Sequence, residues 1–194
     1  MTAPFDTVVA TADVMRGFAH PWWVAGGWAI DLFVGRVTRE HGDIEIGAFR
    51  DTQAVLHAQL RRFKLFKAVD GAFVPWAEGD EIRPPIFQIQ ASDQSLPGGE
   101  LQVFLDDQVD GRWICRRNPA LTRPIEEITL DSGVGGVKFL CPEIQLFFKA
   151  KHSQLAKNQQ DFALVAPLLT PPQRLWARNA IAATHPDHVW LKFL

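Results

Sequence analysis

The chain has 194 residues, 47% of them hydrophobic, and a formal net charge of -2 at pH 7. This length suggests one domain or two small ones, and the composition supports a hydrophobic core and excludes a disordered chain. The net charge gives no reason to expect nucleic acid as a partner. Cys115 and Cys141 are too few for a disulfide framework, which favours a reducing cytoplasm. No apolar run approaches the ~20 residues that span a bilayer, so no membrane partner is expected.

The predicted elements begin with a helix over residues 5–19, where apolar residues recur at helical spacing. A short apolar strand over 22–25 follows, and Gly26-Gly27 turns the chain into a helix over 28–34 that ends at Gly35. Residues 43–49 are expected to form a strand and residues 51–63 a helix. Helix and strand therefore alternate in the first third of the chain.

Short strands separated by turns are predicted from residue 64 to 116, with a hairpin of 101–105 and 112–115 around Asp110-Gly111. Residues 117–136 are expected to be irregular, and helices are predicted over 142–155, 158–168 and 171–183. These patterns predict the α+β class, with an α+β core over residues 1–130 and a C-terminal helical segment over residues 131–194.

Two carboxylates stand at alternate positions of the predicted strand 43–49, at Asp43 and Glu45. Alternate side chains of a strand point to the same face, where two carboxylates are costly unless a cation lies between them. Oxygen ligands suit Mg²⁺, which one or two carboxylates hold while substrate phosphates complete its coordination. The spacing therefore predicts a magnesium site.

Gly26 and Gly27 precede these acids at a predicted helix start. Amides at a helix N-terminus attract phosphate, and glycine lets an anion come close, although an ordinary tight turn has the same pattern. Arg36 and Arg39 follow the helix and suit phosphate oxygens, or else are solvated cations of a loop. The order strand, glycine pair, helix and acidic strand favours the phosphate role.

The run GGWAIDLFVGRVTREHGDIEI (26–46) resembles the active-site motif of the polymerase-beta-type nucleotidyltransferase superfamily. Within it, the chain resembles the small bacterial branch of aminoglycoside and lincosamide nucleotidyltransferases. Three later runs resemble that branch's C-terminal pattern: PEIQLFFKAK (142–151), Lys157 with Asp161-Phe162, and HPDHVWLKFL (185–194). The resemblance implies the nucleotidyltransferase fold, a mixed sheet flanked by helices. It also implies that Gly26 and Gly27 hold nucleotide phosphates and that Asp43 and Glu45 bind the metal.

The resemblance further implies a third carboxylate on the strand 101–105, where the position on the polar face is Gln102. Glutamine is no general base and a poor metal ligand. Glu100 and Asp106 lie on the same face by alternation, and we expect one of them to lie near the acid pair. If neither does, Gln102 marks an impaired site.

Periodicity and position give expectations for the remaining charged residues. Helical spacing places Lys151 on the apolar face of the helix that begins at Pro142, where it must extend to solvent or find an anion such as a nucleotide phosphate. The same spacing places Lys149 on the surface, but both are nucleotide-binding candidates, because the resemblance does not settle which lysine is used. Arg116-Arg117, after the strand 112–115, could reach phosphate or another anionic group, and a solvated strand end is slightly favoured. Asp31 is interpreted as a helix-surface acid or a partner of Arg36.

The expected activity is Mg²⁺-dependent transfer of a nucleoside monophosphate from a nucleoside triphosphate to a hydroxyl of a small molecule, including an antibiotic as one possibility. Two alternatives stay open: a catalytically impaired nucleotide-binding or partner-binding module, and nucleotidyl transfer to a protein side chain. The acceptor, the base preference and the oligomeric state do not follow from the sequence.

Overall fold

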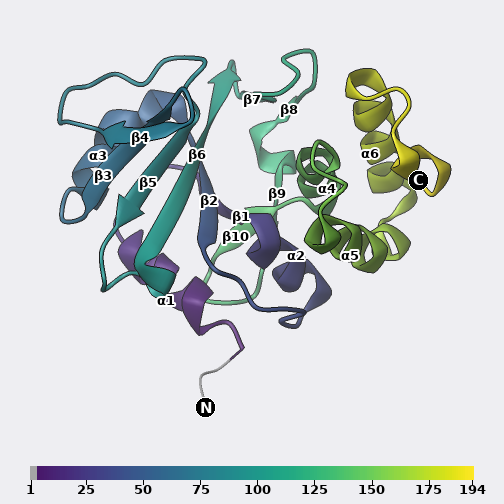
Figure 1. The fold of residues 1–194 in the computed structure, drawn as a ribbon, viewed down its shortest axis with the longest axis horizontal. Coiled ribbons are helices and arrows are strands. Elements are labelled where there is room, and N and C mark those ends of the chain that lie inside the picture. Colours follow the sequence, from purple (N-terminus) through teal and green to yellow (C-terminus); the bar gives the residue numbers. More distant parts are fainter. Residues whose placement is uncertain (1–3) are drawn as a thin grey trace.

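The computed structural model describes residues 4–194, whose strands form a ten-stranded mixed sheet (Figure 1). The strand order is β4-β3-β5-β6-β2-β1-β10-β9, while β7 pairs with the far end of β6 and β8 with β7. The strands are β1 (Trp22–Ala25), β2 (Ile44–Phe49), β3 (Lys64–Val69), β4 (Ala72–Pro75), β5 (Gln88–Ser92), β6 (Glu100–Val109), β7 (Arg112–Ile114), β8 (Thr122–Pro124), β9 (Thr129–Asp131) and β10 (Lys138–Leu140).

Six α-helices accompany this sheet in the described part of the chain, and local signals set their ends. Gly35 ends α2 in the left-handed conformation (φ 79°), where glycine has no Cβ penalty. Thr170 and Gln173 form a capping box at the start of α6. The helices are α1 (Asp6–Val14), α2 (Gly26–Val34), α3 (Gln53–Leu60), α4 (Pro142–Ala150), α5 (Ala156–Val165) and α6 (Pro171–Thr184).

Both tight hairpins of the sheet turn on an Asp-Gly pair with positive φ at both residues. Asp70-Gly71 joins β3 to β4, and Asp110-Gly111 joins β6 to β7. Such turns match the right-handed twist of the flanking strands. The predicted hairpin around residue 110 is confirmed.

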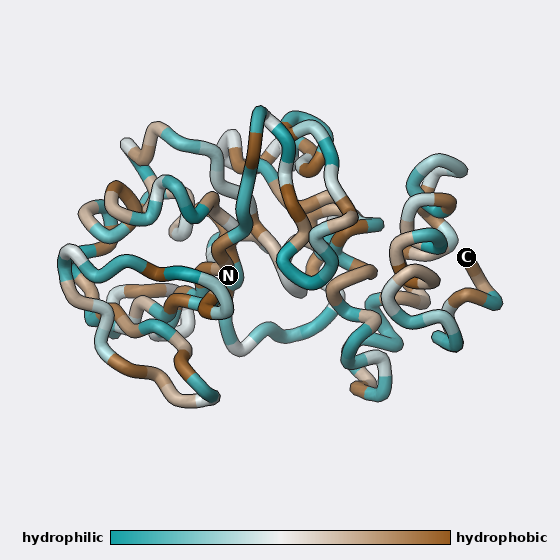
Figure 2. The backbone as a smooth tube through the Cα atoms, turned by 90° about the horizontal axis from the view of Figure 1, so that it is seen from above, coloured by the Kyte–Doolittle hydropathy of each residue, from teal (hydrophilic) through white to brown (hydrophobic). Residues whose placement is uncertain are grey.

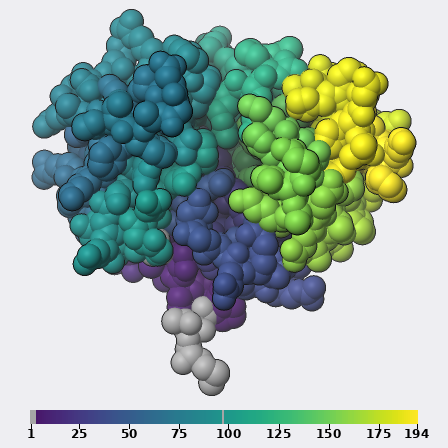
Figure 3. Space-filling model, viewed as in Figure 1, coloured from purple at the N-terminus to yellow at the C-terminus, as the bar shows by residue number. Residues whose placement is uncertain are grey.

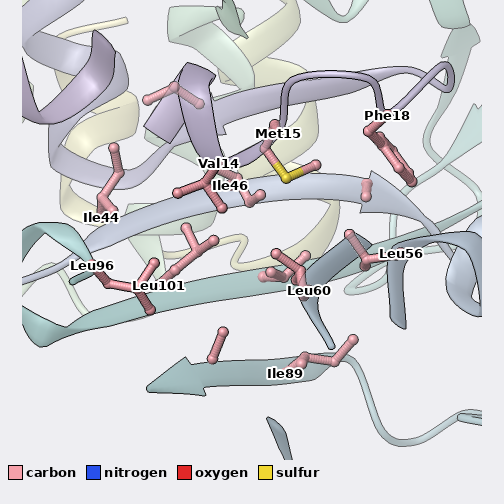
Figure 4. Packing of buried hydrophobic residues seen from close by; sticks show 14 of the residues in the cluster. Val14, Met15, Phe18, Ile44, Ile46, Leu56, Leu60, Ile89, Leu96 and Leu101 are labelled. Carbon is pink, nitrogen blue, oxygen red and sulfur yellow. The ribbon is translucent and has the colours of Figure 1, made fainter. Parts of the chain in front are cut away.

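Alternation along the strands divides the molecule into two hydrophobic cores. The even residues of β2, Ile44, Ile46 and Ala48, face one core together with Leu101 and Val103 of β6. Helices α1 and α3 cover this core, and Figure 4 shows Val14, Leu56 and Leu60 packed over the strands. The odd residues of β2 therefore face the opposite side of the sheet.

The second core lies between β1 and the C-terminal helices. It contains Trp23, Phe49 and Leu140 from the strands and Phe147 and Ile181 from α4 and α6. Seen from above, the helices after residue 142 stand to one side of the strands (Figure 2). On the side of the sheet that the odd residues of β2 face, β5 and β6 contribute no residue to either core among those described. The candidate functional side chains on these strands therefore lie beside the helical segment and not under it.

Several predicted boundaries need correction. The first helix ends at Val14 rather than residue 19, and α4 ends at Ala150 rather than 155. Residues 117–136 are not irregular, because they hold β8 and β9. Three-residue strands are too short for an alternation pattern, and tertiary pairing defines them: β10 pairs with both β1 and β9. The C-terminal helices begin only at Pro142.

Candidate functional site

The candidate site is a cavity of about 210 Å³ between the sheet and the helical segment. Figure 3 shows a hollow between the teal strand region and the green helices. Residues of β1, β2 and β6 form its floor. Ala25 and Trp23 of β1 stand opposite Glu45 and Gly47 of β2, and Gly47 stands opposite Phe104 of β6. Its walls come from β10, from α4, from α5 and the connection between these two helices, and from the segment after β7: Arg116, Arg117, Leu140, Gln145, Phe148, Lys149, His152, Leu155, Lys157 and Asn158.

Glu45 lies at the N-terminus of α2, as the predicted arrangement requires. A Cβ on Gly26 would lie 2.5 Å from Glu45 Oε2, and Gly26 has φ +67°. Glycine is therefore required there both by space and by conformation. The Gly26 amide donates a 2.9 Å hydrogen bond to Gln145 Oε1 of α4. Sequence reasoning missed Gln145, which carries no signal beyond its place in a helix.

Asp43 directly precedes β2 and is fixed by two contacts. Its backbone oxygen accepts from Trp28 Nε1 at 3.1 Å, and its Oδ2 accepts from Gln102 Nε2 at 3.1 Å. Gln102 stands opposite Glu45 in the parallel register of β2 and β6. One amide side chain therefore reaches from the position beside Glu45 to the carboxylate of Asp43.

Burial and the neighbouring Asp43 carboxylate raise the pKa of Glu45 above its ordinary value of 4.5. Lys149, Arg116 and Lys157 act in the opposite direction but do not cancel this effect. Neither Glu45 nor Asp43 forms an ion pair with any residue described. An acid pair of this kind gains stability from a bound cation.

The third carboxylate is not Asp106. That side chain is 1% exposed and accepts from Trp113 Nε1 at 2.9 Å and Arg116 Nη1 at 2.6 Å. It stands opposite Phe49, four residues beyond the position beside Glu45. Glu100 immediately precedes Leu101, the register partner of Ile44, just as Asp43 immediately precedes Ile44. Glu100 is thus the acid on the strand next to Asp43. In the described part of the chain, no three histidine, cysteine, aspartate or glutamate side chains cluster closely enough to hold a metal ion by themselves.

Arg39 and His41 lie beside Gly27 and connect to a buried acid. A Cβ on Gly27 would lie 2.6 Å from Arg39 Nη2 and would also contact the His41 ring. Arg39 Nη1 donates to His41 Nδ1 at 2.9 Å. Because arginine has only donors, Nδ1 accepts, and Nε2 donates to Asp31 Oδ2 at 2.6 Å.

Asp31 is therefore not the helix-surface acid that was predicted, nor a side-chain partner of Arg36. It is fully buried and also accepts from the amide and hydroxyl of Thr38. Burial alone would raise the pKa of Asp31, but the bonds from His41 and Thr38 outweigh it and lower the pKa. Arg36 is exposed.

Lys149, rather than Lys151, reaches the cavity, so the periodicity argument was wrong about both. Lys149 is 9% exposed and its Nζ lies 2.7 Å from Asp161 Oδ2, whereas Lys151 follows the end of α4 and is exposed. Every residue of α4 is buried, so the helix has no solvent face on which a lysine could be placed by elimination. Asp161, on α5, also pairs with Arg39 at 3.4 Å.

Arg116 and Arg117 line the cavity and are not a solvated strand end. Both guanidinium groups lie over the ring of Phe148, at 4.1 and 5.1 Å from its centroid. Arg116 pairs with Asp106, whereas Arg117 donates to the backbone oxygen of Phe148. Burial and the neighbouring Arg116 lower the pKa of Arg117 to about 10. The cavity is lined by four cations, Arg116, Arg117, Lys149 and Lys157, and by the acid Glu45. Asp106 and Asp161 pair with Arg116 and Lys149, whereas Arg117 and Lys157 form no ion pair with any described residue and suit phosphate.

Comparison with known proteins agrees with this geometry. Residues 7–95 match the family model of aminoglycoside-2''-adenylyltransferases. A 2''-aminoglycoside nucleotidyltransferase from Klebsiella pneumoniae is 62% identical over 65 residues, which are 32% of this chain and 36% of that protein. One from Escherichia coli is 62% identical over 26 residues, 13% of this chain and 15% of that protein. The chain thus spans about a third or less of the length of these curated relatives.

Solved structures extend the likeness over almost the whole chain. The antibiotic-resistance factor ANT(2'')-Ia has a TM-score of 0.64 at 17% identity, covering 93% of this chain and 92% of that one. The chain has the nucleotidyltransferase fold. The lincomycin-bound lincosamide adenylyltransferase LnuA has a TM-score of 0.60 at 15% identity, covering 84% of this chain and 97% of that one. The predicted α+β class and the resemblance to aminoglycoside and lincosamide nucleotidyltransferases are confirmed. No helix in the described residues is long and apolar enough to cross a membrane.

Proposed function

We propose that this chain is a Mg²⁺-dependent nucleotidyltransferase that moves a nucleoside monophosphate from a nucleoside triphosphate to a hydroxyl of a small molecule. The observation that carries the proposal is the position of Glu45. It adjoins the N-terminus of α2 at Gly26, is electrostatically coupled to Asp43, and lines a cavity with four cationic side chains. A carboxylate pair beside a cationic cavity is the donor set for a metal–triphosphate complex.

The acid pair fits a magnesium ion. Asp43 and Glu45 would supply carboxylate oxygens, and because burial and the neighbouring Asp43 carboxylate raise the pKa of Glu45, a cation bound between the two acids would favour the ionised form of Glu45. Two carboxylates leave coordination positions for phosphate oxygens, as Mg²⁺ requires. The chemistry that the bound ion supplies is neutralisation of phosphate charge and orientation of the triphosphate for in-line displacement.

Phosphate oxygens are held by groups on two sides of the acid pair. The first-turn amides of α2 have no intrahelical acceptor, and Arg39 lies beside Gly27 in this turn. Lys149 and Arg117 face the same cavity from α4 and from the segment after β7. Because Gln145 accepts from the Gly26 amide, a phosphate at Gly26 must displace that side chain.

In the reaction the acceptor oxygen attacks the α-phosphorus, the bond to the bridging oxygen breaks, and pyrophosphate leaves. The proton of the acceptor hydroxyl needs a base, and we assign this role to Glu100, which precedes Leu101 as Asp43 precedes the register partner Ile44. The relatives named above act on aminoglycosides and lincosamides, which supports an antibiotic-like hydroxyl compound as the acceptor.

Gln102 favours one second candidate, an impaired nucleotide-binding module. It takes the strand position where the family resemblance implies a third carboxylate, and its amide is already bonded to Asp43. In that case Gln102→Glu raises a weak or absent activity, because general-base help is worth about 10²–10⁴-fold in rate.

The test is pyrophosphate release from each of the four nucleoside triphosphates with Mg²⁺, across a panel of hydroxyl acceptors that includes tobramycin and lincomycin. Acceptor-dependent release that is lost in Glu45→Gln supports the transferase. Nucleotide binding without release from any acceptor, and release restored by Gln102→Glu, supports the impaired module. Absence of both binding and release contradicts both candidates.

A further inference from the structure

The sheet continues past the acid pair as a face rich in amide side chains. Gln90 on β5 stands opposite Gln102 on β6, and Phe66 on β3 stands opposite Gln90. Gln88 lies two residues from Gln90 on the same face, opposite Phe104. All five are half-buried, whereas Ile89 and Val103 on the other face are fully buried in the core. We call Phe66, Gln88, Gln90, Gln102 and Phe104 the amide face.

A hydrogen-bonded chain connects this face to the proposed site. Gln88 Nε2 donates to Gln102 Oε1 at 2.8 Å, and Gln102 Nε2 donates to Asp43 Oδ2 at 3.1 Å. An amide offers two donors and an acceptor oxygen with two lone pairs. These two bonds use only part of that capacity. The side chain of Gln90 makes no hydrogen bond to the residues described, so it too can serve hydroxyl groups.

Charge is almost absent from the same face. Along β3, β5 and the first half of β6, the alternate positions that share it carry two ionisable residues, Lys64 and Glu100. These stand on either side of Ser92 at one edge, and their charges cancel. Arg116 borders this face, with its guanidinium 4.9 Å from the centroid of the Phe104 ring, and Arg117, Lys149 and Lys157 line the cavity beyond it.

We propose that the amide face binds the acceptor, and that this acceptor is a polyhydroxylated compound with no more than one positive charge. The proposal rests on the proposed function, because it assigns the acceptor side of that site. Amides and aromatic rings match hydroxyl groups and the apolar faces of sugar-like rings. With Asp43 and Glu45 engaged by Mg²⁺, a polycation finds only the Glu100 carboxylate on the face and the cations of the cavity beside it, which is unfavourable for binding.

Binding is measured directly by calorimetry with three probes: maltose as a neutral glycoside, lincomycin with one amine, and tobramycin with several. The native chain with Mg²⁺ and a non-hydrolysable triphosphate is expected to bind lincomycin or maltose at least tenfold more tightly than tobramycin. Tighter binding of tobramycin, or no binding of any probe, overturns the proposal. Pyrophosphate release is recorded separately, so loss of the transferase function is distinguished from loss of the acceptor assignment.

A charge placed on the face gives a second test. Gln90→Glu adds one carboxylate without touching Asp43, Glu45 or the bond between Gln88 and Gln102, and is expected to tighten tobramycin binding about tenfold relative to lincomycin. The matched control is Gln94→Glu, in an exposed turn outside the face, which is expected to leave the ratio unchanged. An equal shift in both variants shows a long-range charge effect and overturns the assignment of the face.

Discussion

Replacing Asp161 is expected to destabilise the protein through the cations that it holds. Its side chain is 1% exposed and accepts from Lys149 at 2.7 Å and from Arg39 at 3.4 Å, whose side chains are 10% and 19% exposed. Removing one partner of a buried pair costs about 3–5 kcal/mol, because a buried charge is left uncompensated. Asparagine keeps the shape and one acceptor, and Arg39 is partly hydrated, so we expect about 3 kcal/mol for Asp161→Asn.

The assay is urea unfolding of the native chain, Asp161→Asn, Lys149→Met and the double variant. If the cost comes from the orphaned ammonium group, the double variant recovers at least half of the loss seen in Asp161→Asn. Asp187→Asn is the matched control, because Asp187 is exposed in the same C-terminal part, and it is expected to change stability by less than about 0.5 kcal/mol.

A cost below about 1 kcal/mol for Asp161→Asn refutes the assignment of a buried, paired carboxylate. Additive losses in the double variant refute the role of Lys149 in the cost. The same variants separate stability from function. Asp161→Asn is expected to weaken triphosphate binding even where it is fully folded, because Asp161 sets the positions of Lys149 and Arg39 beside the cavity.

Three further predictions concern the acid pair and its surroundings. Gly27→Ala is expected to lose about 1–3 kcal/mol of stability because its Cβ overlaps His41, whereas Gly42→Ala, with open space around it, changes little; thermal unfolding measures both. The raised pKa of Glu45 contributes stability below its ordinary pKa of 4.5 that is lost as pH rises through the folded value. Without Mg²⁺, Glu45→Gln should therefore be more stable than the native chain at pH 7 but not at pH 4, and added Mg²⁺ should stabilise the native chain alone; equal stability at both pH values contradicts this. Glu100→Gln is expected to lower kcat about 10²–10⁴-fold if Glu100 is the base, as measured by pyrophosphate release.

The stretch from β1 to the end of α2 was predictable from sequence because its signals are local. The strand 22–25 has the predicted bounds, and α2 ends at Gly35 as predicted. Glycine pairs, Asp-Gly turns and alternating apolar residues each act within a few positions of the chain. Their spacing is therefore visible without any knowledge of the partner elements.

The walls of the cavity could not be predicted because they depend on long-range packing. The assignment of Lys149 to the surface failed because α4 is buried on all sides by residues distant in sequence. Asp31 was misassigned because its partner His41 lies ten positions away, beyond the reach of helical spacing. Arg117 becomes a cavity residue only because Phe148, 31 positions later, packs against it.

The central claim is that Asp43 and Glu45 bind a triphosphate through a divalent ion, and calorimetric titration of ATP with and without Mg²⁺ tests it most directly. The native chain is expected to bind ATP only with Mg²⁺. Asp43→Asn is expected to lose about 2–5 kcal/mol of that binding free energy, because it removes one of two charges at the ion. Affinity that is independent of Mg²⁺, or equal in Asp43→Asn and the native chain, would contradict the claim.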